Sequence, residues 1–255
     1  MRISDYPLVF AVITFLGLAI MAWIGKWLRK RRPPMPQTVR EDFNLVQAAT
    51  LTLLGLIIGF TFSMAVSRYD QRKNLEEEEA NAIGTAFVRA DLLPTTDAAK
   101  VRALLLRYLD QRIVFYTTRD DEELRQTNAQ IARLQAELWS AVQVPAVAQP
   151  TPLAALTLAG MNDVLNSQGY TQAAWWNRIP RSAWFLLFAI AMCSNVMVGY
   201  GGTSQRDGKV LMLILPLVVA IAFLLVADID SPRSGLIRLS PQNLESLSES
   251  LRAKQ

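Results

Sequence analysis

Four long apolar runs are the strongest pattern in the chain, and they cover roughly residues 8–27, 48–66, 183–200 and 210–227. Each is about 17–20 residues long, the length that a helix needs to cross about 30 Å of hydrocarbon. The runs contain no Asp, Glu or Arg, and their only lysine, Lys26, lies near an end, where its ammonium group reaches the interface. We therefore predict four transmembrane helices and not the core helices of a water-soluble protein.

Helical periodicity continues through the long segment between the second and third runs. Asp120 and Asp121 are placed to cap a helix in which Leu124, Ile131 and Leu138 recur every seven residues. Packing inside a helical bundle explains this heptad, and an intermolecular coiled coil is the alternative. Three prolines predict a linker, followed by a weak helix at about 153–168. They are Pro145, Pro150 and Pro152.

The predicted fold class is therefore all-α, with four transmembrane helices and a helical-bundle extramembrane domain between the second and third. The expected regions are 1–66 for the first two membrane helices with their connecting loop, 67–182 for the bundle, 183–227 for the last two membrane helices, and 228–255 for a C-terminal tail. The basic cluster follows the first apolar run, the reverse of a signal peptide, so we expect that helix to be retained.

Basic residues gather in the two short loops between membrane helices. The first loop carries Lys26, Arg29, Lys30, Arg31 and Arg32. The second loop adds Arg206 and Lys209. Because short cytoplasmic loops are enriched in Lys and Arg, this bias predicts that both loops are cytoplasmic and that segment 67–182 faces outward. Beside the third membrane helix, Trp175, Trp176 and Trp184 are expected to form an interfacial belt.

The composition removes several kinds of chemistry. The chain has no histidine and a single cysteine, Cys193. Disulfides within the chain, Cys/His zinc sites and nucleophile–histidine pairs are therefore excluded. No glycine-rich phosphate loop is present either. The net charge of +4 is explained by basic residues at membrane edges, so nucleic-acid binding is not indicated. We expect no catalytic residue, no metal, no cofactor and no enzyme activity.

Small residues repeat every four positions along the second membrane helix, at Gly55, Gly59, Ser63 and Ser67. This spacing forms one stripe on which another helix can approach closely. Packing within the same chain and association with a second copy both fit the pattern.

The same helix continues without Gly or Pro into four consecutive glutamates, residues 76–79. At 100° per residue, Glu76, Glu79 and Arg72 fall within about 40° of Ile83, on the apolar face, whereas Glu77 and Glu78 point toward solvent. Arg72 and Glu76 are one turn apart and are predicted to pair. An intramolecular ion pair that fixes the bundle and a charged vestibule formed by several subunits are the two interpretations. Asp228, Asp230 and Arg233, where the last membrane helix ends, are further candidates for ion contact.

Two stretches resemble the bestrophin-like domain family of bacterial membrane proteins. They are GFTFSMAVSRYDQRKNLEEEEANAIGTAFVRADLLP at residues 59–94 and DIDSPRSGLIRLS at residues 228–240, and the resemblance covers roughly residues 40–240. The family name implies a distant likeness to bestrophins, which are oligomeric, anion-selective channels. The large soluble part of a bestrophin is cytoplasmic, opposite to the side that the charges predict here, and no acidic run resembles the bestrophin calcium clasp.

The functional expectation is a multi-pass protein of the bacterial inner membrane that acts as an oligomeric ion channel. Its expected partners are the lipid bilayer, further copies of itself and an inorganic ion. A non-catalytic sensing, scaffolding or envelope protein is the alternative function.

Overall fold

Two compact units make up the protein, and both contain part of the long helix α2. The computed structural model describes residues 6–202 and 208–253, and every regular element in these ranges is helical. The membrane unit comprises residues 1–67 and 178–237, and the bundle unit comprises residues 68–177 and 238–255. The region expected as a separate tail, residues 228–255, is thus divided between the two units.

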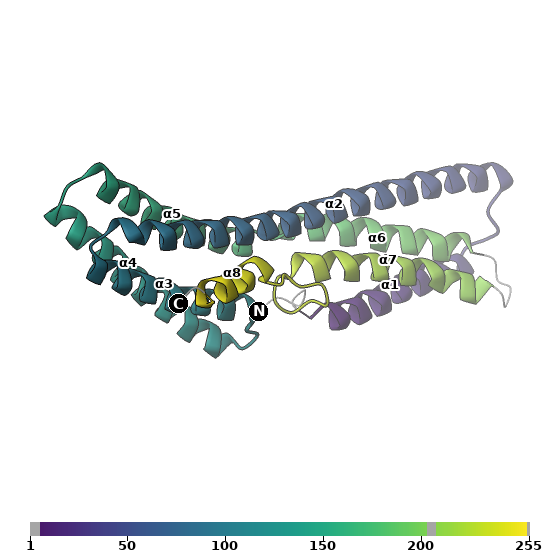
Figure 1. The fold of residues 1–255 in the computed structure, drawn as a ribbon. Helices are drawn as coiled ribbons and strands as arrows, with labels where there is room; N and C mark the ends of the chain where they lie inside the picture. Colours follow the sequence, from purple (N-terminus) through teal and green to yellow (C-terminus); the bar gives the residue numbers. More distant parts are fainter. Residues whose placement is uncertain (1–5, 203–207, 254–255) are drawn as a thin grey trace. The chain divides into compact units, whose positions relative to one another are not determined.

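The membrane unit is built from α1 (Pro7–Lys30), the first part of α2 (Gln37–Arg89), α6 (Arg181–Gly201) and α7 (Gly208–Asp230) (Figure 1). These four helices are long and apolar enough to cross a bilayer, which confirms the four predicted spans. Pro33, Pro34 and Pro36 lie in the short connection between α1 and α2, where they prevent helix continuation. The core contains an aromatic cluster with ring centroids 5.2–6.3 Å apart. Its members are Phe10, Trp184, Phe188 and Phe223.

Helices α1 and α6 approach each other at two glycines. A Cβ atom at Gly25 would overlap the carbonyl oxygen of Val196, and one at Gly199 would overlap that of Ala22. Small residues permit this close approach, which is a common way for membrane helices to gain packing energy.

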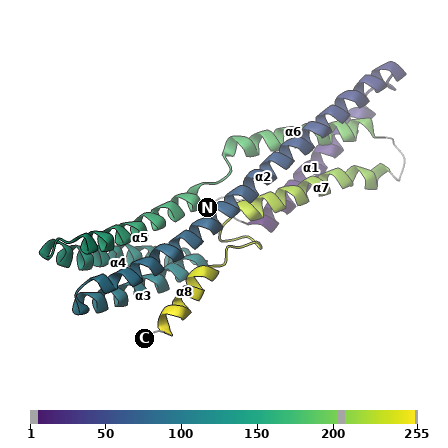
Figure 2. The same ribbon diagram turned by 45° about the horizontal axis from the view of Figure 1, so that its top comes forward.

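The bundle unit combines the later part of α2, the short 3₁₀ turn η2 (Ala90–Leu92), α3 (Thr95–Thr117), α4 (Asp121–Ala148), α5 (Pro152–Trp176) and α8 (Gln242–Arg252). Figure 2 shows α3, α4 and α5 running beside this part of α2. As predicted, Asp120 caps α4, because its carboxylate accepts a hydrogen bond from the backbone N–H of Glu122. Thr151 caps α5 in the same manner through Ala154.

Two sequence expectations about this unit are wrong. Pro145 lies inside α4, so the connection to α5 is only residues 149–151, and α5 is much longer than the expected weak helix. Trp175 is 5% exposed and packs against Phe115 and Tyr116 in the bundle core, so it is not part of an interfacial belt. The heptad leucines and isoleucine of α4 do lie in this core, which confirms bundle packing.

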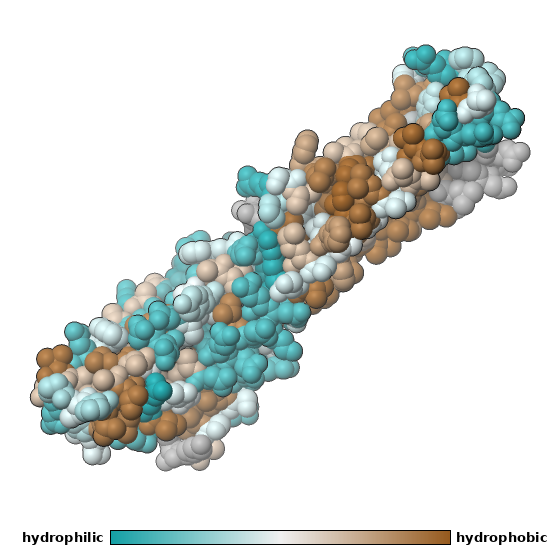
Figure 3. Space-filling view, turned by 90° about the horizontal axis from the view of Figure 1, so that it is seen from above, coloured by the Kyte–Doolittle hydropathy of each residue, from teal (hydrophilic) through white to brown (hydrophobic). Residues whose placement is uncertain are grey.

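The outer surface of the membrane unit is apolar. Figure 3 shows hydrophobic side chains over much of the part of this unit that is in view. On α1 alone, Leu8, Val12, Leu16 and Trp23 are more than half exposed. Such a surface is stable only when lipid or another protein covers it.

Candidate functional site

The four glutamates of α2 divide into two buried and two exposed residues. Glu76 and Glu79 are 1% and 0% exposed, whereas Glu77 and Glu78 face solvent. This division follows from the helical phase relative to Ile83, which is itself fully buried. The phase predicted from the sequence is therefore confirmed, and the role of each buried carboxylate depends on its neighbours.

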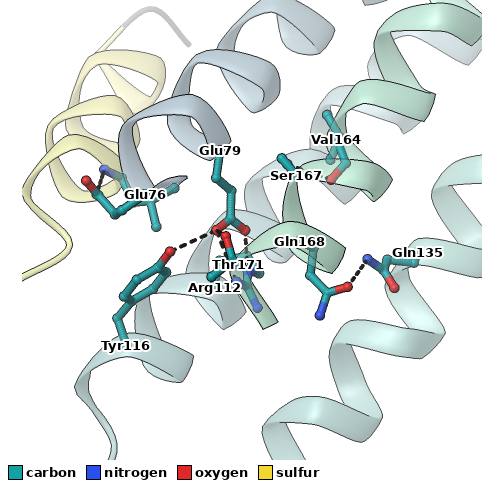
Figure 4. Close-up of polar contacts among 10 residues, drawn as sticks. Glu76, Glu79, Arg112, Tyr116, Gln135, Val164, Ser167, Gln168 and Thr171 are labelled. Atoms are coloured by element: carbon teal, nitrogen blue, oxygen red, sulfur yellow. Dashed lines mark hydrogen bonds and ion pairs between the residues drawn. The ribbon is translucent and has the colours of Figure 1, made fainter. Parts of the chain in front are cut away.

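Glu79 lies at the centre of a polar cluster inside the bundle unit (Figure 4). Its carboxylate forms a bidentate ion pair with Arg112 of α3, in which Nη2 donates to Oε2 at 3.0 Å and Nε donates to Oε1. Tyr116 and Thr171 donate their hydroxyl groups to Oε2 at 3.1 and 3.2 Å. These contacts join α2, α3 and α5, so this carboxylate connects three helices of the bundle.

Arg112 is held by aromatic rings as well as by Glu79. Its guanidinium carbon lies 4.4 Å from the ring centroid of Phe115 and 5.7 Å from that of Tyr116. Among the residues that the structure describes, its Nη1 atom has no hydrogen-bond partner. The Phe115 ring provides cation–π attraction in the absence of such a partner. The side chain is 0% exposed, so its charge depends on Glu79 for compensation.

The same environment shifts the titration of the neighbouring groups. Burial raises the pKa of Tyr108 and of Tyr116 far above the ordinary tyrosine value, and the negative charge of Glu79 raises both further. Burial alone would lower the pKa of Arg112, but Glu79 outweighs this effect and raises it. Both tyrosines therefore remain neutral and Arg112 remains charged at physiological pH.

Glu76 interacts with a different element, the C-terminal helix α8. Its Oε1 accepts a hydrogen bond of 2.9 Å from the backbone N–H of Leu244, and its Oε2 accepts one of 2.6 Å from the Asn243 side chain. Both donors lie in the first turn of α8, whose own preceding residue, Pro241, provides no side-chain cap. A distant carboxylate thus caps this helix, where the helix dipole also favours negative charge.

Arg72, the third residue of the predicted set, is 2% exposed. Its guanidinium group donates to the backbone carbonyl oxygens of Ala174 and Asn177, at 3.3 and 3.4 Å. These carbonyls belong to the last turn of α5 and its C-cap, where a cation satisfies unpaired acceptors. The pairing of Arg72 with Glu76 stays a prediction.

The aspartates at the end of α7 bind backbone groups of the membrane unit. Asp228 accepts hydrogen bonds from the N–H groups of Leu236 and Ile237, at 2.7 and 2.8 Å. Asp230 accepts from Ile179 through both of its oxygens, at 3.1 and 3.2 Å. Both carboxylates are at most 5% exposed, and Arg233 nearby is partly buried. In these positions they fix the path of the chain as it leaves α7.

The small-residue stripe has a different environment from the acidic residues. Gly55, Gly59, Ser63 and Ser67 are all exposed on the membrane unit. No heavy atom from another part of the described chain lies within 4 Å of a Cβ built at Gly55 or Gly59. These two glycines therefore do not pack against another described helix of the same chain, and what covers them stays a prediction.

The described residues contain no group of three or more His, Cys, Asp or Glu side chains that could hold a metal ion. Each of the four carboxylates in the predicted set accepts hydrogen bonds from groups within its own unit. Their arrangement is suited to fixing helices and chain ends in place. Among the predicted site residues that the structure describes, Gly55, Gly59, Ser63 and Ser67 of α2 are therefore the exposed group that could contact a partner.

Comparison with known proteins places this arrangement in a family. A family profile for the Bestrophin-like domain matches residues 16–244, which is most of the chain. The chain belongs to the Bestrophin-like domain family. Curated proteins give no match to this Bestrophin-like chain.

Solved structures of bacterial bestrophin homologues share the fold of this Bestrophin-like chain. A bestrophin homologue from Klebsiella pneumoniae is 14% identical with a TM-score of 0.67, and the alignment covers 95% of this chain and 97% of that one. A point variant of that homologue is 12% identical with a TM-score of 0.68, covering 95% of this chain and 98% of the variant. At such low identity the likeness shows a common fold only.

Sequence reasoning found the buried glutamates of this Bestrophin-like chain but missed most of their partners. Arg112, Tyr116 and Thr171 lie 33, 37 and 92 residues from Glu79. Arg112 was detectable, because it follows Leu105 and Tyr108 on the apolar face of its helix, where a lone cation requires a buried anion. The partnership of Glu76 with α8 has no comparable signal.

Proposed function

We propose that this protein is a subunit of an oligomeric ion channel and that its copies meet through the exposed face of α2. The observation that supports this best is the stripe of Gly55, Gly59, Ser63 and Ser67, which the described part of the single chain leaves exposed. Only 17% of the apolar window of this helix is buried within the chain, compared with 44% for the last membrane helix. A helix with so few intrachain neighbours is free to contact other subunits or a pore.

Lipid is a poor partner for such a stripe. Glycine and serine offer little apolar area to lipid chains, and glycine also costs roughly 0.5–1 kcal/mol in a helix interior compared with alanine. The same residues are favourable where two helix backbones approach closely. Self-association therefore gives these positions a physical role that lipid contact does not.

The family relationship supports the second half of the proposal, transport of an inorganic ion. Bestrophins are oligomeric, anion-selective channels, so we propose that the ion is an anion. The buried carboxylates act in this scheme as supports: Glu79 joins the bundle helices and Asp228 holds the segment after α7. We assign no catalytic role to the chain and no cofactor.

We also propose that the protein lies in the bacterial inner membrane with the bundle unit facing away from the cytoplasm. The basic residues between α1 and α2 support this orientation, because short cytoplasmic loops are enriched in Lys and Arg. The orientation of bestrophins favours the opposite arrangement, so this part of the proposal has its own test, given in the Discussion.

The oligomeric channel is tested by mass and by flux. Gly59→Leu adds a large side chain where the single chain has open space, so the fold of the chain should survive while a close contact between copies is lost. Ile58→Leu, next to it but partly buried in the core, is the matched control.

We expect the wild type and Ile58→Leu to form the same ring-sized particles and to carry anions across liposomes, and Gly59→Leu to lose both properties. Equal particle mass for the two variants would show that the stripe faces lipid. A wild-type monomer without flux would leave a sensing or scaffolding role instead.

A further inference from the structure

A basic cavity opens in the membrane unit where α1 ends and α2 begins. It has a volume of about 450 Å³, and four of its lining residues are cationic. They are Arg29, Lys30, Arg32 and Arg40. The remaining lining residues include Asn44 and Tyr200, and none of the lining residues that the structure describes is Asp or Glu. The cavity therefore concentrates positive charge around a space large enough for a small anionic group.

Among the described residues, the cations of this cavity have no acidic partner, and Arg29 is held by other contacts. Arg29 donates a hydrogen bond of 2.9 Å to the carbonyl oxygen of Pro33, and its guanidinium carbon lies 5.7 Å from the Tyr200 ring centroid. Within the described part of the chain, no carboxylate forms an ion pair with Arg32 or Arg40. The positive-inside rule depends on the number of Lys and Arg residues in a short loop and not on their arrangement. The orientation of the protein in the membrane therefore does not require these cations to surround a cavity.

A second cavity of about 440 Å³ shares Lys30 with the first. It is lined mostly by apolar groups, which come from α1 and α7. They are Trp23, Trp27, Met212 and Leu213, and Lys26 joins Lys30 among them. Tryptophan is enriched where membrane and water meet, so this cavity lies at the depth of lipid headgroups and upper acyl chains. The first cavity thus suits an anion and the second cavity suits hydrocarbon.

We propose that these two cavities, which share Lys30 as a lining residue, bind one anionic phospholipid, with its phosphate among Arg29, Arg32 and Arg40 and an acyl chain beside Trp23 and Trp27. Guanidinium groups bind phosphate oxygens through short, charge-assisted hydrogen bonds, which favours phosphate over a neutral headgroup. Lys30, which lines both spaces, marks where the headgroup joins its chain. The site is separate from the α2 stripe, so it does not depend on channel activity.

The test uses the full chain in detergent and phosphatidylglycerol or phosphatidylcholine with brominated acyl chains. Bromine quenches nearby tryptophan fluorescence, and the chain has four tryptophans besides Trp23 and Trp27. The part of the quenching that Trp23→Phe with Trp27→Phe removes therefore reports occupancy of the apolar cavity. Titrations at about 0.3 M salt reduce diffuse attraction, because the Debye length is then under about 8 Å. The expected result is preferential quenching by phosphatidylglycerol.

Substitutions separate a built site from general attraction. Arg32→Gln with Arg40→Gln should weaken the preference for phosphatidylglycerol by about tenfold or more, the effect of losing charged hydrogen bonds. Arg181→Gln is the matched control, because Arg181 is an exposed cation of the membrane unit that lines neither cavity. It should change the preference less than twofold, and Arg32→Lys with Arg40→Lys should retain most of it.

Three results would overturn the proposal. The first is the absence of any wild-type preference for phosphatidylglycerol. The second is an equal loss in Arg181→Gln and in the double variant, which would show diffuse attraction. The third is full competition by millimolar inorganic phosphate, which would make free phosphate the ligand and not a lipid.

Discussion

Replacing Glu79 by glutamine should destabilise the bundle unit far more than any other substitution among the four consecutive glutamates. The change preserves the size of the side chain but removes its charge. Arg112 would then be an uncompensated cation at 0% exposure, surrounded by aromatic rings. Removing one partner of a buried ion pair typically costs about 3–5 kcal/mol. Loss of an acceptor for Tyr116 or Thr171 adds to this cost.

The assay is unfolding of the full chain in detergent, followed by near-ultraviolet circular dichroism. Trp175 packs against Tyr116 in the same core, so its signal reports the packing of the unit. Glu78→Gln is the control, because it removes the same charge one residue away on the exposed face and should cost under about 1 kcal/mol.

A double variant tests whether the unpaired charge of Arg112 causes the loss of stability. Glu79→Gln combined with Arg112→Met removes both charges and should recover part of the lost free energy of unfolding, since an apolar pair avoids the unpaired cation. If Glu79→Gln proves no more harmful than Glu78→Gln, or if the double variant is worse than the sum of the single variants, the ion-pair reasoning is refuted.

Three other predictions follow from the structure. Because burial raises the pKa of Tyr116 above that of an unfolded tyrosine, the folded state should lose stability as the pH rises above about 10, by about 1.4 kcal/mol per pH unit for this residue. Tyr116→Phe should make the free energy of unfolding less dependent on pH in this range, whereas Tyr170→Phe, at an exposed position, should not. Gly199→Ala should lower the melting temperature of the purified chain through overpacking against α1, at a cost of about 1–3 kcal/mol, whereas Gly17→Ala, which has open space, should have no such effect. A cysteine at exposed Gln126 in a cysteine-free background should react with a membrane-impermeant thiol reagent in intact cells; labelling only after lysis would place the bundle unit in the cytoplasm.

The sequence predicts the features that depend on local periodicity. The four membrane spans follow from apolar runs, and the burial of Glu76 and Glu79 follows from 100° steps along one helix. The same reasoning predicts packing of the α4 heptad, because its apolar residues share one face. These inferences need no knowledge of distant contacts.

The features that depend on distant contacts were not predictable in this way. The sequence around Pro145 predicts the start of a linker, yet this proline lies within α4. The position of Trp175 beside a membrane helix predicts an interfacial location, because tryptophans are enriched there, but the core of the bundle unit buries this side chain. The close approach of Gly25 and Gly199 involves single glycines on two separate helices, which form no motif along the chain.

The capping of α8 by Glu76 has a consequence for how the protein is made. Leu244, which provides the backbone donor, follows Glu76 by 168 residues. At about 5–20 residues per second, the ribosome reaches it roughly 8–34 seconds after the carboxylate has been synthesised. During this interval a chaperone or water must shield the carboxylate, and the bundle unit cannot reach its final form. Nascent chains stalled before residue 243 should therefore be recognised by proteolytic quality control, although all four membrane helices and all of α3–α5 have been synthesised before that point.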